Sequence, residues 1–101
     1  MVTYVSRATI NGVENRQKAI EWASRVCRYA ENRFGFSNMR PGLEVYGRVG
    51  TMWRLGDHRN LESLAKAIQA SWADDGYRRL LNEARGLFVL GSIEDIVIQR
   101  W

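Results

Sequence analysis

The chain has 101 residues, a length at which one hydrophobic core forms and two do not. Hydrophobic residues make up 46% of the sequence and charged residues 26%, a balance that is typical of folded domains and excludes a disordered chain. The formal net charge is +4, but the basic residues do not cluster clearly and alternate with acidic ones over residues 16–31, so no concentrated patch for an anionic polymer is indicated. We therefore expect a single folded domain over residues 1–101.

Two features of the composition favour an intracellular protein. No stretch approaches the ~18 to 20 apolar residues that a membrane-spanning helix needs, and the first residues contain no apolar signal region. The single cysteine, Cys27, cannot form an internal disulfide, whereas secreted domains of this size commonly rely on two or more. We expect a cytoplasmic protein with no membrane partner, in which Cys27 is a packing residue.

The first half of the sequence predicts a strand, a long helix and a second strand. Residues 3–10 are rich in β-formers, and their even positions are more apolar than their odd positions. Apolar residues then recur at helical spacing up to Gly35, a natural stop signal. This stripe consists of Ala19, Trp22, Ala23, Val26, Cys27, Ala30 and Phe34. Residues 36–42 contain the only proline and are predicted to be a loop, whereas the alternation over residues 43–49 predicts a strand.

The second half predicts a hairpin, two helices and a last strand. Gly50 separates residues 43–49 from 51–55, which favours an antiparallel hairpin, with one strand bent at a glycine bulge as the alternative. Asn60 is a helix cap. The two helices that follow have the apolar stripes Leu61, Leu64, Ala65, Ile68 and Trp72, and Tyr77, Leu80, Leu81, Ala84 and Phe88. Residues 93–101, with three successive β-branched residues, predict a strand that is covered on both faces.

The predicted order, β-α-β-β-α-α-β, matches the ferredoxin-like split β-α-β framework, in which helices cover one face of a four-stranded antiparallel sheet. We therefore expect an α+β fold whose second sheet face is free for a partner or a ligand. The period of two along each strand decides which side chains lie on that free face. The residues expected there are Val5, Arg7, Thr9, Glu44, Tyr46 and Arg48, with Trp53 or Arg54 and Val97, Gln99 and Trp101 from the last two strands.

Aromatic, apolar and arginine side chains on one sheet face suit two uses. In the first, a second chain packs sheet to sheet and encloses a cavity in which an arginine holds an anionic or enolic group. In the second, Tyr46 and Trp53 stack unpaired nucleic-acid bases. Residues 45–53, read as VYGRVGTMW, lack the basic-glycine-aromatic signature that RNA-binding domains of this strand order carry. The sequence therefore favours the first use over a nucleic-acid partner.

The element order, together with GRVGTMWRL at 47–55, LESLAKAI at 61–68 and DDGYRRLLNEARGLF at 74–88, resembles the dimeric α+β barrel superfamily. The chain is similar above all to the NIPSNAP-like and antibiotic-biosynthesis-monooxygenase-like members, and the resemblance spans nearly its whole length. In those families an acidic residue and an aromatic residue open the second helical segment, as Asp75 and Tyr77 do here. The resemblance implies a homodimer whose two sheets pair into a barrel, but the superfamily has no shared catalytic motif to carry across.

Few side chains in this sequence offer catalytic chemistry. The only histidine, His58, follows the third strand, where Asp57 could orient its imidazole for general-base work, and a surface histidine near a helix start is the alternative. With one histidine and one cysteine far apart, neither a zinc site nor a Cys-His nucleophile pair is expected. The glycines lack the strand-to-helix setting of a phosphate loop. We expect no metal and no cofactor, although a metal held by carboxylates alone stays open.

The sequence thus predicts a homodimeric α+β barrel protein that binds a small organic ligand between its paired sheets. The predicted ligand-binding residues are Arg7, Tyr46 and Trp53. If the protein is an enzyme, the resemblance permits cofactor-independent oxygenation or isomerisation, with Arg48 stabilising an enolate and His58 moving a proton. The alternatives are a non-catalytic interaction module and an RNA-binding sheet platform.

Overall fold

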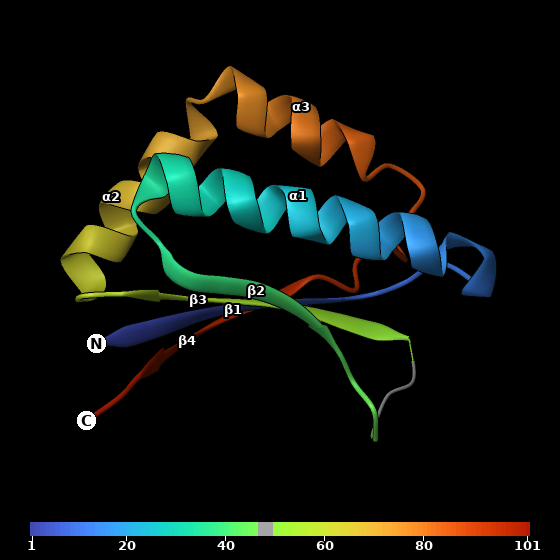
Figure 1. Cartoon of the computed structure of the whole chain (residues 1–101), viewed down its shortest axis with the longest axis horizontal. Coiled ribbons are helices and arrows are strands. Elements are labelled where there is room, and N and C mark those ends of the chain that lie inside the picture. The colour runs from blue at the N-terminus through green and yellow to red at the C-terminus, as the bar shows by residue number, and fades with distance from the viewer. Residues whose placement is uncertain (47–49) are drawn as a thin grey trace.

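The computed structural model describes residues 1–46 and 50–101, and these residues form two layers. Three helices lie on one face of a four-stranded antiparallel sheet, and the opposite sheet face carries no described element (Figure 1). We call this opposite side the open face. The strands are β1 Val2–Thr9, β2 Ser37–Leu43, β3 Thr51–His58 and β4 Glu94–Gln99. The three α-helices are α1 Arg16–Phe34, α2 Leu61–Trp72 and α3 Asp75–Glu83, and a short 3-10 turn, η1 Val13–Asn15, precedes α1. The predicted ferredoxin-like α+β arrangement is confirmed.

Helix α1 provides the helical side of the core. Its buried residues are the seven predicted from the apolar stripe: Ala19, Trp22, Ala23, Val26, Cys27, Ala30 and Phe34. The helix ends at Gly35, whose φ of 72° lies in the left-handed region that favours glycine. Because a long amphipathic helix carries its whole pattern within its own sequence, the sequence alone was sufficient to predict its buried face.

The strand register determines which side chains lie under the helices. The sheet order is β2-β3-β1-β4, so β3 and β1 are central and β2 and β4 are edges. On β1 and β3 the even residues face the helices, as shown by Met52, which packs with Trp22 in the core. The odd residues lie on the open face, where the Thr3 hydroxyl donates to Asp57 over 2.7 Å. Since Val5 pairs with Ile96, the even residues of β4 also lie on the open face.

Strand β2 begins and ends six residues earlier than predicted. It occupies Ser37–Leu43, a segment whose proline and small polar residues had predicted a loop. Pro41 is tolerated because β2 is an edge strand, where a missing N–H leaves no partner strand unsatisfied. The register shifts between Ser37 and Arg40, and Asn38 has a φ of 54° within this irregularity.

The hairpin between the second and third strands is confirmed, but its connection is longer than a single glycine. The backbone N–H of Glu44 still donates to the Thr51 carbonyl over 3.0 Å, and the chain then leaves the sheet. Val45 and Tyr46 lie in this connection and are exposed. Arg48 and Val49, which were predicted to lie on the strand, fall outside the described residues.

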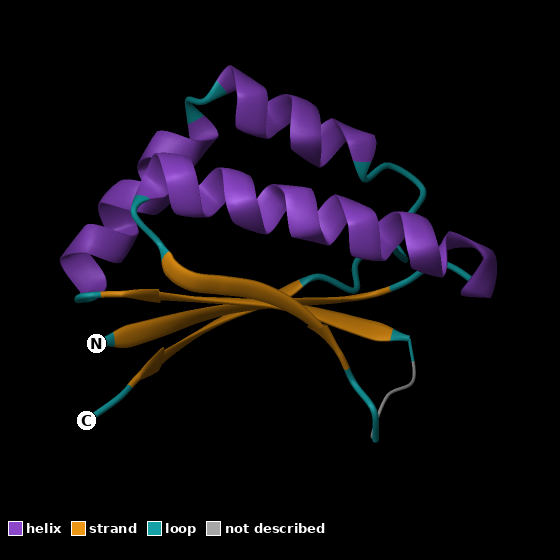
Figure 2. Ribbon diagram, in the orientation of Figure 1, coloured by secondary structure: helices purple, strands orange, loops and turns teal. Residues whose placement is uncertain are grey.

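Strand β4 differs from its prediction most clearly. Its β-branched run predicted a strand covered on both faces, yet all six of its residues are exposed (Figure 2 shows the strand at one edge of the sheet). The helices pack over the other strands and do not reach it, because the described helices contact β1, β2 and β3. The run therefore has the composition of a buried strand and no cover from the described residues of this chain.

Candidate functional site

The open face has an apolar centre with ion pairs at its two ends. Val5 is 2% exposed, because its neighbours Leu55 and Ile96 flank it on the adjacent strands. Leu55, Ile96 and Ile98 are themselves 37%, 39% and 48% exposed. The charged residues at the ends are paired in this structure: Arg7 with Glu94 at 3.0 Å, and Asp57 with Arg100 at 2.9 Å. This face therefore offers apolar surface in the middle and an ion pair at each end.

Arg7 and Trp53, two of the three predicted ligand-binding residues, lie together on the open face. The guanidinium carbon of Arg7 is 5.4 Å from the centroid of the Trp53 ring, a cation–π contact. Arg7 also donates to the Glu94 carboxylate, so its charge has a partner within the chain. The period of two along β1 and β3 was the signal that predicted this placement.

The remaining predicted residues lie elsewhere. Tyr46 is 93% exposed in the connection after β2 and does not join Arg7 and Trp53. Arg48 lies outside the described residues. Arg54, Val97 and Gln99 have the parity of the helix side rather than of the open face, because one residue along a strand reverses the face.

His58 lies at the end of β3 under the helices, 7% exposed. Its ring packs edge-on against Phe36, with centroids 4.4 Å apart, and its Nδ1 lies 3.1 Å from the Ser63 hydroxyl. Nε2 is buried without a hydrogen-bond partner in the described part of the chain. Burial lowers the pKa of His58, an effect that the backbone at Phe34 partly offsets, so the imidazole is neutral at physiological pH.

The pairing of Asp57 with His58 that the sequence suggested does not form. Consecutive strand residues point to opposite faces, so the Asp57 carboxylate lies on the open face. There it accepts hydrogen bonds from Thr3 and pairs with Arg100, and these contacts lower the pKa of Asp57, with Thr3 the largest cause. The two side chains are therefore separated by the sheet, and Asp57 cannot orient the imidazole.

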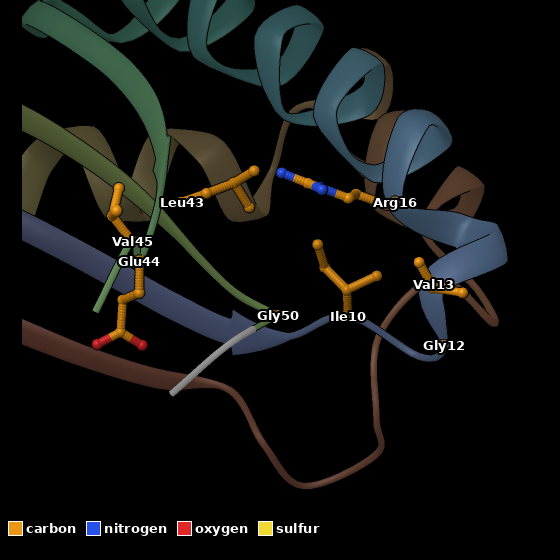
Figure 3. A pocket seen from close by; sticks show the side chains of 8 residues that line it. All are labelled: Ile10, Gly12, Val13, Arg16, Leu43, Glu44, Val45 and Gly50. Atoms are coloured by element: carbon orange, nitrogen blue, oxygen red, sulfur yellow. The ribbon is translucent and has the colours of Figure 1, made fainter. Parts of the chain in front are cut away.

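A cleft of about 560 Å³ opens on the helix side, between the start of α1 and the adjoining ends of β2 and β3 (Figure 3). Its apolar walls are Ile10, Val13, Leu43 and Val45. The Arg16 side chain extends over Ile10 toward Leu43, whereas the Glu44 carboxylate points away from the cleft (Figure 3). Arg16 is in none of the ion pairs of the described residues.

No local pattern in the sequence predicts this cleft, because its walls come from segments far apart in the chain. Ile10 follows β1, Arg16 begins α1, and Leu43 ends β2. The sequence does predict that these segments lie near one another, because a helix that follows the first strand must start at the same end of the sheet as the hairpin connection. Only the observed end of β2 at Leu43, rather than at residue 49, opens the space beside it.

Arg54 lies in the middle of the helix-side layer. Its guanidinium carbon is 5.3 Å from the Trp22 ring centroid, and Nη2 is 3.3 Å from the Ser6 hydroxyl. Nη1 is buried and has no hydrogen-bond partner among the described residues. Burial by itself would lower the pKa of Arg54, but Tyr77, Tyr4 and Cys27 nearby raise it overall, so the side chain stays charged.

Two negative findings apply to the described residues only. Within 1–46 and 50–101, no three His, Cys, Asp or Glu side chains gather in a way that could hold a metal ion. In the same part of the chain, no helix combines the length and the apolar character needed to cross a membrane.

Comparison with solved structures identifies the fold. No model of a known protein family and no curated protein sequence matches the chain. A NIPSNAP domain protein from Burkholderia xenovorans superposes with a TM-score of 0.81 at 7% identity, covering 100% of this chain and 95% of that one. A structure from Deinococcus radiodurans named for the antibiotic biosynthesis monooxygenases gives 0.76 at 10% identity, covering 100% and 93%.

SnoaB from Streptomyces nogalater, named as a cofactor-independent oxygenase, gives a TM-score of 0.68 at 16% identity, covering 98% of this chain and 91% of that one. Both groups that the sequence resembles are thus among the structural neighbours, and the predicted resemblance is confirmed at the level of the fold. At these identities the likeness says nothing about chemistry.

Proposed function

We propose that the protein is a homodimer paired through its open sheet face, and that each subunit binds a small, mostly apolar organic acid in the cleft at Arg16. The observation that carries the ligand proposal is the cleft itself. Its volume of about 560 Å³ falls within the ~300–1,000 Å³ that is usual for small-molecule sites. Apolar walls around a single guanidinium are the pattern of a site for an acid with a hydrocarbon body.

Arg16 supplies the polar contact in this proposal. A guanidinium forms two parallel hydrogen bonds with a carboxylate, and such charge-assisted contacts are stronger than neutral ones. Val13 and Val45 are 83% and 82% exposed, so an apolar body laid against them would remove surface from water. Glu44 also borders the cleft, but its carboxylate points away from it (Figure 3).

The ligand position predicted from the sequence, between two paired sheets at Arg7 and Trp53, is the competing site. Arg7 already pairs with Glu94 and stacks on Trp53, so an acid bound there must displace an existing ion pair. Arg16 has no such partner among the described residues. The two arginines therefore make a matched pair of test positions.

Calorimetric titration with octanoate, and with octanol as the uncharged control, tests the proposal. Arg16→Gln should weaken octanoate binding by about 10- to 150-fold, the range for a charge-assisted hydrogen bond of ~1.5–3 kcal/mol. Arg7→Gln should leave the affinity unchanged. Loss of affinity with Arg7→Gln alone would instead support the site between the sheets, and equal binding of octanol and octanoate would contradict an arginine anchor.

Pairing through the open face is supported by its apolar centre and by β4, which is exposed along its whole length. These surfaces suit a second copy better than a nucleic acid. Of the two aromatic residues expected to stack bases, only Trp53 lies on the sheet, and the arginine beside it is paired. A non-catalytic interaction module would use the same face, and the absence of any acid binding would favour it.

Catalysis is the second candidate function. The name of SnoaB suggests cofactor-independent oxygenation, and the sequence assigned enolate stabilisation to Arg48 and proton transfer to His58. His58 lies under the helices with its Nε2 free, while Arg7 and Trp53 lie on the other face, so these groups cannot act on one substrate atom. Binding of an acid therefore has more structural support than a reaction does.

A further inference from the structure

Arg54 carries a buried charge for which the described part of the chain supplies no counter-charge. The side chain is in none of the ion pairs of those residues. Nη1 is buried without any hydrogen-bond partner. Its hydrogen bond from Nη2 to the Ser6 hydroxyl, at 3.3 Å, is longer than the usual 2.7–3.2 Å, and the other oxygen beside it is the hydroxyl of Tyr77, which is not an acid side chain. Removing a charge from water without a partner is unfavourable, so an anion bound next to Arg54 would stabilise the native state.

The groups around Arg54 that could carry a negative charge do not supply one. Burial raises the pKa of Tyr4 to about 12 and that of Cys27 to about 11, so both are neutral at physiological pH. The Tyr4 hydroxyl donates to Asp95 instead, over 3.0 Å. Trp22 contributes only the face of its ring. The counter-charge must therefore come from outside these residues.

A small cavity lies beside the guanidinium and has the dimensions of a very small ligand. Its volume is about 30 Å³, and its lining includes Ser6, Trp22, Met52, Arg54, Phe88 and Ile93. One water needs roughly 10–15 Å³ measured in this way, so the space holds two or three heavy atoms. Ile93 is 63% exposed, which places this end of the cavity near solvent.

We propose that Arg54 and Ser6 bind a small carboxylate, of about the size of formate, in this cavity between the sheet and α1. Nη1 donates to one carboxylate oxygen, and the Ser6 hydroxyl or Nη2 donates to the other. This site is separate from the cleft at Arg16, and it is too small for the body of an acid such as octanoate. The bound carboxylate neutralises the charge of Arg54.

Chemical unfolding in formate, at constant ionic strength set with the bulky anion of MES buffer, tests the proposal. A ligand bound only to the native state lowers the unfolding constant by 1 + [L]/Kd, about 100-fold at 100 times Kd. We expect saturable stabilisation by formate in the wild-type protein and equally in Arg16→Gln, whereas octanoate, which is proposed to bind the cleft at Arg16, should stabilise Arg16→Gln less than the wild type. Arg54→Met should abolish the formate dependence, whereas Arg28→Met, which removes an exposed guanidinium, should retain it. Equal dependence in the two variants would overturn the proposal.

A second measurement needs no variant at this position to fold. In side-chain 15N spectra of the wild-type protein, formate should shift one arginine resonance saturably, and Arg16→Gln should retain that resonance. Linear shifts of many arginine signals, or no shift at all, would overturn the proposal. This readout uses formate and an arginine distinct from Arg16. Formate binding at Arg54 can therefore be absent while octanoate binds at Arg16, and octanoate binding can be absent while formate binds.

Discussion

Trp22 and Trp72 lie on apolar helix stripes in the sequence, and both were predicted to be core residues. Trp22 is 5% exposed, donates from Nε1 to the Leu80 carbonyl over 2.6 Å, and contacts the edge of Phe88. Trp72 is 69% exposed at the end of α2, so its prediction was wrong. A stripe shows which face of a helix is apolar, but it does not show how far along that helix the neighbouring elements reach.

Substituting these two tryptophans should therefore have unequal effects. Trp22→Phe removes the hydrogen bond to the Leu80 carbonyl and leaves space in the core, so we expect a loss of about 1–3 kcal/mol in the free energy of unfolding. Trp72→Phe should stay within about 0.5 kcal/mol of wild type. Urea denaturation monitored by circular dichroism measures both, and comparable losses would contradict the difference in burial.

His58 should make stability depend on pH. Burial lowers its pKa in the native state, so between that value and the ordinary value of about 6.5 the unfolded chain binds more protons than the native one. Stability is then complete above pH ~6.5 and falls as the pH is lowered through this window. His58 is the only histidine, so His58→Gln should flatten this part of a stability–pH profile. An unchanged slope in the variant would show that the imidazole is not the cause.

At the scale of elements, the sequence predicted best where a pattern is complete within one segment. The stripe of α1 and its stop at Gly35 agree with the structure residue by residue. The prediction for β2 was wrong because Pro41 is typical of loops. The pairing of β2 with β3 also depends on a bulge and on an edge position in the sheet. Edge position is a property of the whole sheet, and no local pattern around Pro41 encodes it.

The start of α2 is a local feature that the sequence predicted correctly. The Asn60 side chain accepts from the Ser63 N–H over 2.9 Å, and Ser63 in turn accepts from the Asn60 N–H, forming a capping box. We expect Asn60→Ala to lower the free energy of unfolding by about 0.5–2 kcal/mol. Asn82→Ala, at an exposed position of α3, is the matched control and should change it by less than about 0.5 kcal/mol.

For the whole molecule, strand parity accounts for which site residues the sequence could bring together. Arg7 and Trp53 lie together on the open face as predicted, because predicting the face of a strand residue needs only the strand assignment and the period of two. Arg16 was not foreseen as a site residue, and Arg54 was expected only on the open face as an alternative to Trp53, since the surroundings of both depend on how α1 crosses the sheet. The same limit applies to β4: its composition predicted cover on both faces, and nothing within the described chain provides it.

The uncovered open face makes dimerisation the decisive test at this scale. Ile96, 39% exposed on the open face of the edge strand β4 and next to Val5, would become buried if two copies paired there. Ile96→Lys would then bury an unpaired ammonium in each subunit, which should weaken the dimer by at least about 100-fold, given ~3 kcal/mol or more for an uncompensated buried charge. Leu81→Lys is the matched control, because Leu81 is 41% exposed but lies on α3, away from the sheet. Sedimentation at micromolar concentration should show a wild-type dimer, a dimeric Leu81→Lys variant and a folded Ile96→Lys monomer. A wild-type monomer, or dissociation by Leu81→Lys alone, would contradict pairing through the open face.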